Sequence, residues 1–137
     1  MPIVIGAISP HGIRTIPLLS ETADGAPETR KALLELGRRF AAAAPEILVI
    51  CGPHGIRVNG FVSLSDTVRG AGTAYWRDKQ VELNVPMDRE FAQLVADKAQ
   101  ARGVPVAQVG YGGTNAWQSV LQLDWSVIVP AWFAAYQ

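Results

Sequence analysis

The pentapeptide Pro-His-Gly-Ile-Arg occurs twice, at residues 10–14 and 53–57, and each copy follows a short apolar run. These runs, residues 3–8 and 46–51, have the length of buried strands, and the proline and glycine after them are typical turn residues. We therefore predict two buried strands, each ended by a turn that carries a histidine.

The segment between the two repeats predicts an amphipathic helix over residues 27–44. Apolar residues recur there at steps of three and four, Pro27 suits a first helical position, and Pro45 ends the pattern. A strand, a helix and a strand favour a βαβ unit with parallel strands, because a right-handed crossover lays the helix over one sheet face. The residues expected on the polar side of the helix are Arg30, Lys31, Glu35, Arg38 and Arg39.

The rest of the chain continues the alternation of strands and helices. Residues 58–85 predict extended excursions or an added hairpin. A second helix is expected over 88–102, with Asp88 as its N-cap and Gly103 after its end, and a third buried strand over 104–109. We predict one α/β domain over residues 1–137, a mainly parallel sheet flanked by helices. The state of residues 117–123 and 127–133 stays open.

Composition excludes several classes of function. The chain carries 12 Lys+Arg against 12 Asp+Glu with no basic run, which argues against nucleic-acid binding. No apolar stretch approaches the roughly 20 residues of a membrane-spanning helix, and no secretory signal is visible. Cys51 is the single cysteine, so no internal disulfide is possible, and we expect a cytoplasmic protein.

The two histidines of the chain, His11 and His54, lie in the two repeats. Parallel strands bring their carboxyl ends to one sheet edge, so both imidazoles are expected there. Imidazole suits Fe, Zn, Cu or Ni, and two imidazoles with a carboxylate form the facial triad of non-haem Fe(II) oxygenases. The alternative is that each histidine only caps its own turn. Cys51 could join a Cys-x-x-His site, or serve as a small buried hydrophobe.

Three segments resemble the class III extradiol ring-cleavage dioxygenase superfamily. They are Ile8-Ser-Pro-His-Gly, Ile50-Cys-Gly-Pro-His-Gly and Leu123-Asp-Trp-Ser-Val-Ile-Val-Pro. The resemblance spans nearly the whole chain and implies an α/β fold with Fe(II) held by two histidines and a glutamate. It also implies a catechol-like aromatic substrate into which dioxygen is inserted. His11 and His54 match the histidine ligands, and another divalent metal remains possible.

The sequence departs from this family in two ways. Trp125 stands where the family has its acid/base histidine, and indole has no usable basic nitrogen. The glutamate ligand has no match, because the chain resembles only the first portion of the family's domain and is expected to be incomplete at its C-terminus. Asp66, Glu82 and Asp124 are the carboxylates that could substitute for it.

These departures leave two other hypotheses open. One is a non-catalytic metal- or small-molecule-binding protein, similar to the Memo-like branch of the superfamily. The other is a small subunit whose missing carboxylate or acid/base group comes from a partner chain. As partners we expect either further copies in a homo-oligomer or such a partner subunit. In the enzyme, the residues expected to line the substrate pocket are Asn115, Ser119, Asp124 and Trp125. The aromatic tail around Trp132 and Phe133 is either a buried terminal element or an oligomer face.

Overall fold

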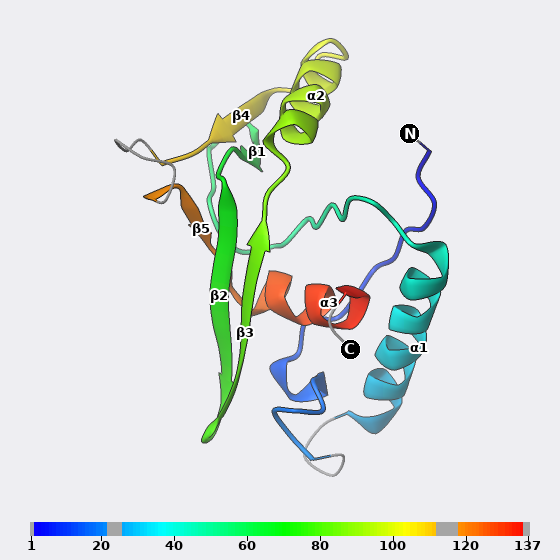
Figure 1. Ribbon diagram of the computed structural model, residues 1–137. Coiled ribbons are helices and arrows are strands. Elements are labelled where there is room, and N and C mark those ends of the chain that lie inside the picture. Colours follow the sequence, from blue (N-terminus) through cyan, green and yellow to red (C-terminus); the bar gives the residue numbers. More distant parts are fainter. Residues whose placement is uncertain (1, 22–25, 112–117, 136–137) are drawn as a thin grey trace. The chain divides into compact units, whose positions relative to one another are not determined.

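The computed structural model describes residues 2–21, 26–111 and 118–135 (Figure 1). These residues form two compact units. Unit 1 comprises Met1–Pro53, Thr73–Leu83 and Asp124–Gln137, and unit 2 comprises His54–Gly72 and Asn84–Leu123. Each unit has its own packed elements, and we describe them separately.

Unit 1 is built mainly from two helices, α1 (Pro27–Ala43) and α3 (Trp125–Ala135), which pack against each other together with the short 3-10 turn η1 (Ile13–Thr15). The apolar side of α1 contributes Leu33 and Phe40 to the core, and α3 contributes Ile128, Val129 and Phe133. Because α3 is apolar on almost every side, it is stable only where it is buried. Phe133 is 1% exposed, so the aromatic tail is a buried element at this residue.

The strands β2 (Arg69–Trp76) and β3 (Lys79–Pro86) form a hairpin closed by Arg77 and Asp78. Arg77 has a left-handed φ of 55°, as the tight reversal requires. On its other side, β2 pairs in parallel with β5 (Val120–Gln122), and the strand order is β3-β2-β5. The outer part of the hairpin, Thr73–Leu83, belongs to unit 1, and its base belongs to unit 2.

Unit 2 also holds a second, two-stranded sheet. Its strands β1 (Val62–Ser65) and β4 (Val106–Val109) run parallel, and helix α2 (Arg89–Gln100) packs on both of them. Asp88 caps α2 by accepting a hydrogen bond from the Phe91 amide at 2.8 Å. Gly103 follows the helix with a left-handed φ of 77°, a conformation that glycine adopts without strain.

The structure confirms the α/β fold class, both predicted amphipathic helices, the hairpin within residues 58–85 and the strand that ends at Val109. It also settles one open segment, because residues 127–133 are helical despite Pro130. Within the described ranges, no helix has the length and apolar character needed to cross a membrane.

The predicted βαβ unit is wrong, because neither residues 3–8 nor residues 46–51 form a strand. Ile3 and Ile8 in the first run and Val49 in the second are exposed. A strand is stabilised by neighbours that take up its backbone groups, and both sheets of the described chain are built from other segments. An apolar run of this length therefore did not suffice to specify a strand.

The sequence pattern also placed Arg30 on the polar side of α1, and this prediction is wrong. Arg30 is 6% exposed, on the buried face that it shares with Leu33, Gly37 and Phe40. Its Nη2 donates to the carbonyls of Arg14 and Ser20 and to the Ser20 hydroxyl, at 2.7, 3.0 and 2.7 Å. These oxygens make burial of the guanidinium possible.

Candidate functional site

His11 lies in unit 1 just before η1 and is half-buried. The turn that follows it is held by Thr15, whose amide and hydroxyl both donate to the Gly12 carbonyl, at 2.9 and 2.6 Å. Thr15 is itself buried. The backbone beside His11 is thus anchored to the unit, while part of the imidazole reaches the surface.

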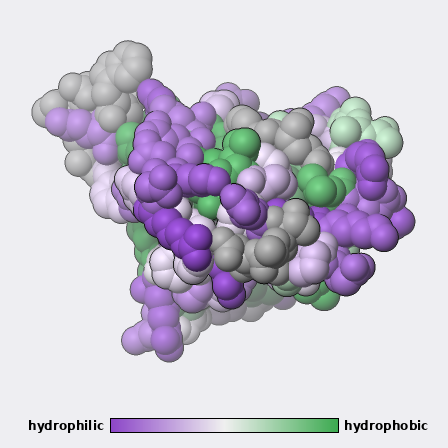
Figure 2. All heavy atoms as spheres, turned by 90° about the horizontal axis from the view of Figure 1, so that it is seen from below, coloured by the Kyte–Doolittle hydropathy of each residue, from purple (hydrophilic) through white to green (hydrophobic). Residues whose placement is uncertain are grey.

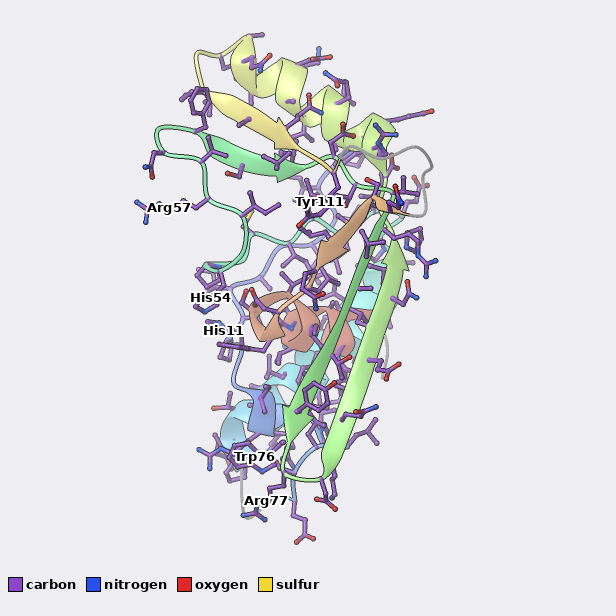
Figure 3. All side chains as sticks on the ribbon, turned by 90° about the vertical axis from the view of Figure 1, so that its left-hand side faces the viewer. His11, His54, Arg57, Trp76, Arg77 and Tyr111 are labelled. Atoms are coloured by element: carbon purple, nitrogen blue, oxygen red, sulfur yellow. The ribbon has the colours of Figure 1, made fainter. Side chains whose placement is uncertain are left out.

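His54 is the first residue of unit 2 and is exposed. It comes from the extended connection that leads to β1, as does the exposed Arg57 (Figure 3). Gly55 after it has a φ of 109°, a conformation that residues with a side chain rarely adopt.

The two copies of Pro-His-Gly-Ile-Arg therefore have different backbones. Gly12 of the first copy has a φ of −67°, whereas Gly55 of the second has 109°. The first copy leads into a 3-10 turn at Ile13, and the corresponding Ile56 does not. The sequence identity is thus not explained by one turn conformation that both copies need.

Each candidate carboxylate has a local partner. Asp66 accepts from the Arg89 Nε at 2.7 Å, and this hydrogen bond lowers the pKa of Asp66 below its usual range, against a smaller opposing effect of burial. Glu82 accepts from the Gln80 side-chain amide at 3.0 Å. Asp124 accepts from the Ser126 amide at 2.6 Å at the start of α3. All three carboxylates contribute to local structure.

A complete metal site is not formed by these side chains. In the described part of the chain, no three histidine, cysteine, aspartate or glutamate side chains lie close enough together to hold a metal ion. His11 and His54 are thus two candidate ligands without a third. Cys51 is exposed, which excludes its interpretation as a small buried hydrophobe.

The predicted pocket residues are distributed over both units. The Ser119 carbonyl accepts from the amides of Val68 and Arg69, so this residue holds the start of β2. Asp124 precedes α3 and Trp125 is the first residue of that helix, both in unit 1, and Trp125 is 48% exposed. Asn115 lies outside the described residues.

A cluster around Trp76 was not predicted from the sequence. Trp76 and Arg77 lie at the end of the β2–β3 hairpin (Figure 3), and the guanidinium carbons of Arg14 and Arg77 lie 5.2 and 6.0 Å from the Trp76 ring centroid. Both distances are within the range of cation–π attraction. Arg14 and Trp76 are 62 positions apart, and no local pattern in the sequence predicts their contact.

The surface carries apolar residues among polar ones, as one face of the molecule shows (Figure 2). Exposed hydrophobic side chains are present in unit 1 at Ile3, Val4 and Ile8, and in unit 2 at Phe61 and Val62.

No known protein-family model matches this chain, and no significant match to a curated protein was found.

Proposed function

We propose that His11 and His54 are ligands of one divalent metal ion, Fe(II) in the first place, in a protein of the extradiol dioxygenase type. The observation that carries this proposal is the pentapeptide that occurs twice in two different backbone conformations. If both copies formed the same turn, the requirements of that turn could explain why the same residues occur twice. The two copies have different backbone conformations, so this explanation does not apply. A shared chemical role of the two imidazoles is the remaining reason for the identity.

The exposure of the two side chains supports the same proposal. His11 is half-buried and His54 is exposed, so neither imidazole is enclosed in a core. Fe(II) at such a site would supply adjacent coordination positions for a catechol-like aromatic substrate and dioxygen. The described residues provide two of the three ligands of a facial triad, and we derive no reaction step from them.

A non-catalytic metal- or small-molecule-binding function is the second candidate. It is favoured by Trp125, whose half-exposed indole cannot accept a proton at the position of the family's acid/base histidine. A partner chain that supplies the missing ligand is a variant of the first proposal. In each case we propose a cytoplasmic location, because the single exposed thiol of Cys51 suits a reducing compartment.

Anaerobic titration with Fe(II) tests the proposal. We expect one ion per chain in the unaltered protein and at least about a tenfold loss of affinity in both His11→Gln and His54→Gln. Lys31→Gln, at an exposed position of α1, is the control and should bind as the unaltered protein does. Equal binding by all variants, or binding by none, would overturn the metal proposal.

Oxygen uptake separates the two candidate functions. The Fe(II)-loaded protein is given a panel of catechols, and uptake that disappears in both histidine variants supports a ring-cleaving enzyme. Binding of Fe(II) through both histidines without uptake supports the non-catalytic protein. The first step therefore tests the site, and the second step tests the reaction.

A further inference from the structure

The dipeptide Asn-Gly occurs once in the chain, at residues 59–60, where it forms an exposed turn of unit 2. The Phe61 amide donates to the Val58 carbonyl at 3.2 Å and closes this turn, which leads into β1. Gly60 has a φ of 82°, the value for the third residue of a type II turn, where glycine is favoured. Asn59 and Gly60 are therefore the two central residues of a β-turn.

The backbone nitrogen of Gly60 is accessible for a reaction. Among the residues that the structure describes, none accepts a hydrogen bond from this amide, and both Asn59 and Gly60 are exposed. A Cβ added at Gly60 would meet nothing within 4 Å, so the backbone there has open space around it. One hydrogen bond at the long end of the usual range closes the turn, so its local opening costs little free energy. The Gly60 nitrogen can thus approach the Asn59 side chain.

The residues on either side of the turn stay anchored when it opens. The Val58 amide donates to the Ser63 Oγ at 3.1 Å, and the Val62 amide donates to the Pro105 carbonyl at 2.8 Å. Neither hydrogen bond involves the two central residues of the turn. A chemical change at these two residues therefore stays local, and we expect unit 2 to keep its fold.

We propose that Asn59 is a site of spontaneous covalent modification, at which its side-chain amide is converted into a carboxylate. The Gly60 nitrogen attacks the Asn59 Cγ. The bond between these two atoms forms, the bond from Cγ to Nδ2 breaks, and the proton of the attacking amide leaves with the amino group as ammonia. The product of this step is a cyclic succinimide. The proposal is independent of the metal site.

Water is the second reactant and opens the ring. Its hydroxyl adds to either ring carbonyl carbon, and the bond from that carbon to the Gly60 nitrogen breaks as the nitrogen takes the remaining proton. Opening at the side-chain carbonyl leaves aspartate at position 59. Opening at the main-chain carbonyl leaves isoaspartate, in which the main chain runs through the former side chain. Either product adds one negative charge to a chain whose formal net charge is zero.

Asn84 shows what protects an exposed asparagine of the same unit. It lies within β3 and is followed by Val85. Its side-chain oxygen accepts from the Arg69 Nε at 3.1 Å and also from the Arg69 Nη2. The strand restrains its backbone, the guanidinium restrains its side chain, and the β-branched Val85 crowds the nitrogen that would attack. Exposure alone is therefore not sufficient, and Asn84 is an internal control.

Incubation of the full chain in mildly alkaline buffer, followed by peptide mapping with mass spectrometry, tests the proposal. We expect Asn59 to be converted into aspartate and isoaspartate while Asn84 stays unchanged, with a more acidic band on isoelectric focusing. The rate in the folded protein should lie within about tenfold of the rate in the urea-unfolded chain, because the open turn lets the reacting atoms meet. Circular dichroism should show that the converted protein is still folded.

Gly60→Ala is the matched variant, because a Cβ beside the attacking nitrogen should slow the conversion at least about tenfold. Gly103→Ala is its control, since Gly103 is also exposed and has a φ of 77° in the same unit. It should convert Asn59 at the rate of the unaltered protein.

Three results would each overturn the proposal: an Asn59 that stays unchanged in the folded protein, equal conversion of Asn59 and Asn84, or an unchanged rate in Gly60→Ala. If Gly60→Ala loses its helical circular dichroism, the comparison of the folded and the urea-unfolded unaltered protein decides alone.

Discussion

The Arg89 Nε lies 2.7 Å from the Asp66 Oδ1, and Arg89 Nη2 lies 3.3 Å from Oδ2 of the same carboxylate. This two-point contact joins the first residue of α2 to the residue that follows β1. It lowers the pKa of Asp66 from its ordinary value of 3.8, chiefly through the hydrogen bond. The helix and the strand of unit 2 are thus linked by an ion pair as well as by packing.

Replacing Arg89 by alanine should raise the pKa of Asp66 toward its ordinary value. A carboxyl group whose pKa is lowered by folding stabilises the folded state above the unfolded-state pKa, and this contribution is lost as the pH falls through the folded-state pKa. The unaltered protein should therefore be slightly more stable than Arg89→Ala at neutral pH and equally stable in acid.

An NMR titration of the Asp66 carboxyl and urea unfolding at about pH 7 and about pH 3 would check this prediction. Arg102→Ala removes an equal charge from the turn that follows the same helix, where Arg102 donates to the Lys98 carbonyl, and should leave the Asp66 pKa unchanged. An unchanged Asp66 pKa in Arg89→Ala would contradict the role assigned to the hydrogen bond.

Gly72 should not tolerate a side chain. A Cβ at this position of β2 would overlap the carbonyl oxygen of Leu123, which is backbone and cannot rotate away. We expect Gly72→Ala to lower the free energy of unfolding by about 2 kcal/mol or more.

Two further glycines serve as controls in the same urea unfolding series. A Cβ at Gly70 would lie 3.1 Å from the flexible Leu123 side chain, and one at Gly6 would meet nothing within 4 Å. The loss should therefore be largest at Gly72, smaller at Gly70 and near zero at Gly6. A neutral Gly72→Ala would show that β2 and Leu123 are less closely packed than described.

Arg30→Leu should destabilise the protein although it introduces an apolar residue into a core. The change leaves the carbonyls of Arg14 and Ser20 without their buried donor, and each such loss costs about 1–3 kcal/mol. Lys31→Leu, at the next residue of α1, which is exposed, should have little effect on stability. Thermal unfolding of both variants compares them, and equal stability would argue that Arg30 is solvated.

Asp88→Ala should lower the free energy of unfolding by about 1 kcal/mol, because it removes the side-chain oxygen that accepts from the Phe91 amide at the start of α2. Asp88→Asn keeps an acceptor there and should retain most of the stability. Chemical unfolding followed by circular dichroism measures both variants. Equal losses in the two would mean that the charge of Asp88 matters more than its hydrogen bond.

The elements that could be predicted from the sequence are those with local signals. The helix α1 has apolar periodicity and Pro27, and α2 has Asp88 before it and Gly103 after it. These signals act within a few residues of each helix. The hairpin was one of the two structures, extended excursions or a hairpin, predicted for residues 58–85.

The wrong predictions concern features that depend on distant partners. Residues 3–8 and 46–51 have strand-like composition, but a strand also requires a neighbouring strand, and that cannot be read from a single run. Arg30 is charged and was assigned to the polar face, yet its oxygen partners come from residues 9 to 16 positions earlier in the chain. Of the candidate site, the sequence offered two histidines and three carboxylates, and each of these carboxylates has a local partner in the structure.

The order of the segments in the two units has a consequence for synthesis on the ribosome. Unit 2 is complete once Leu123 has emerged, whereas the core of unit 1 needs Ile128, Val129 and Phe133 of α3. Helix α1 is made early and can pack against α3 only after α3 has left the exit tunnel. The last segment that unit 2 needs is therefore made before the last segment that unit 1 needs, and residues 1–53 are without the α3 part of their core until then.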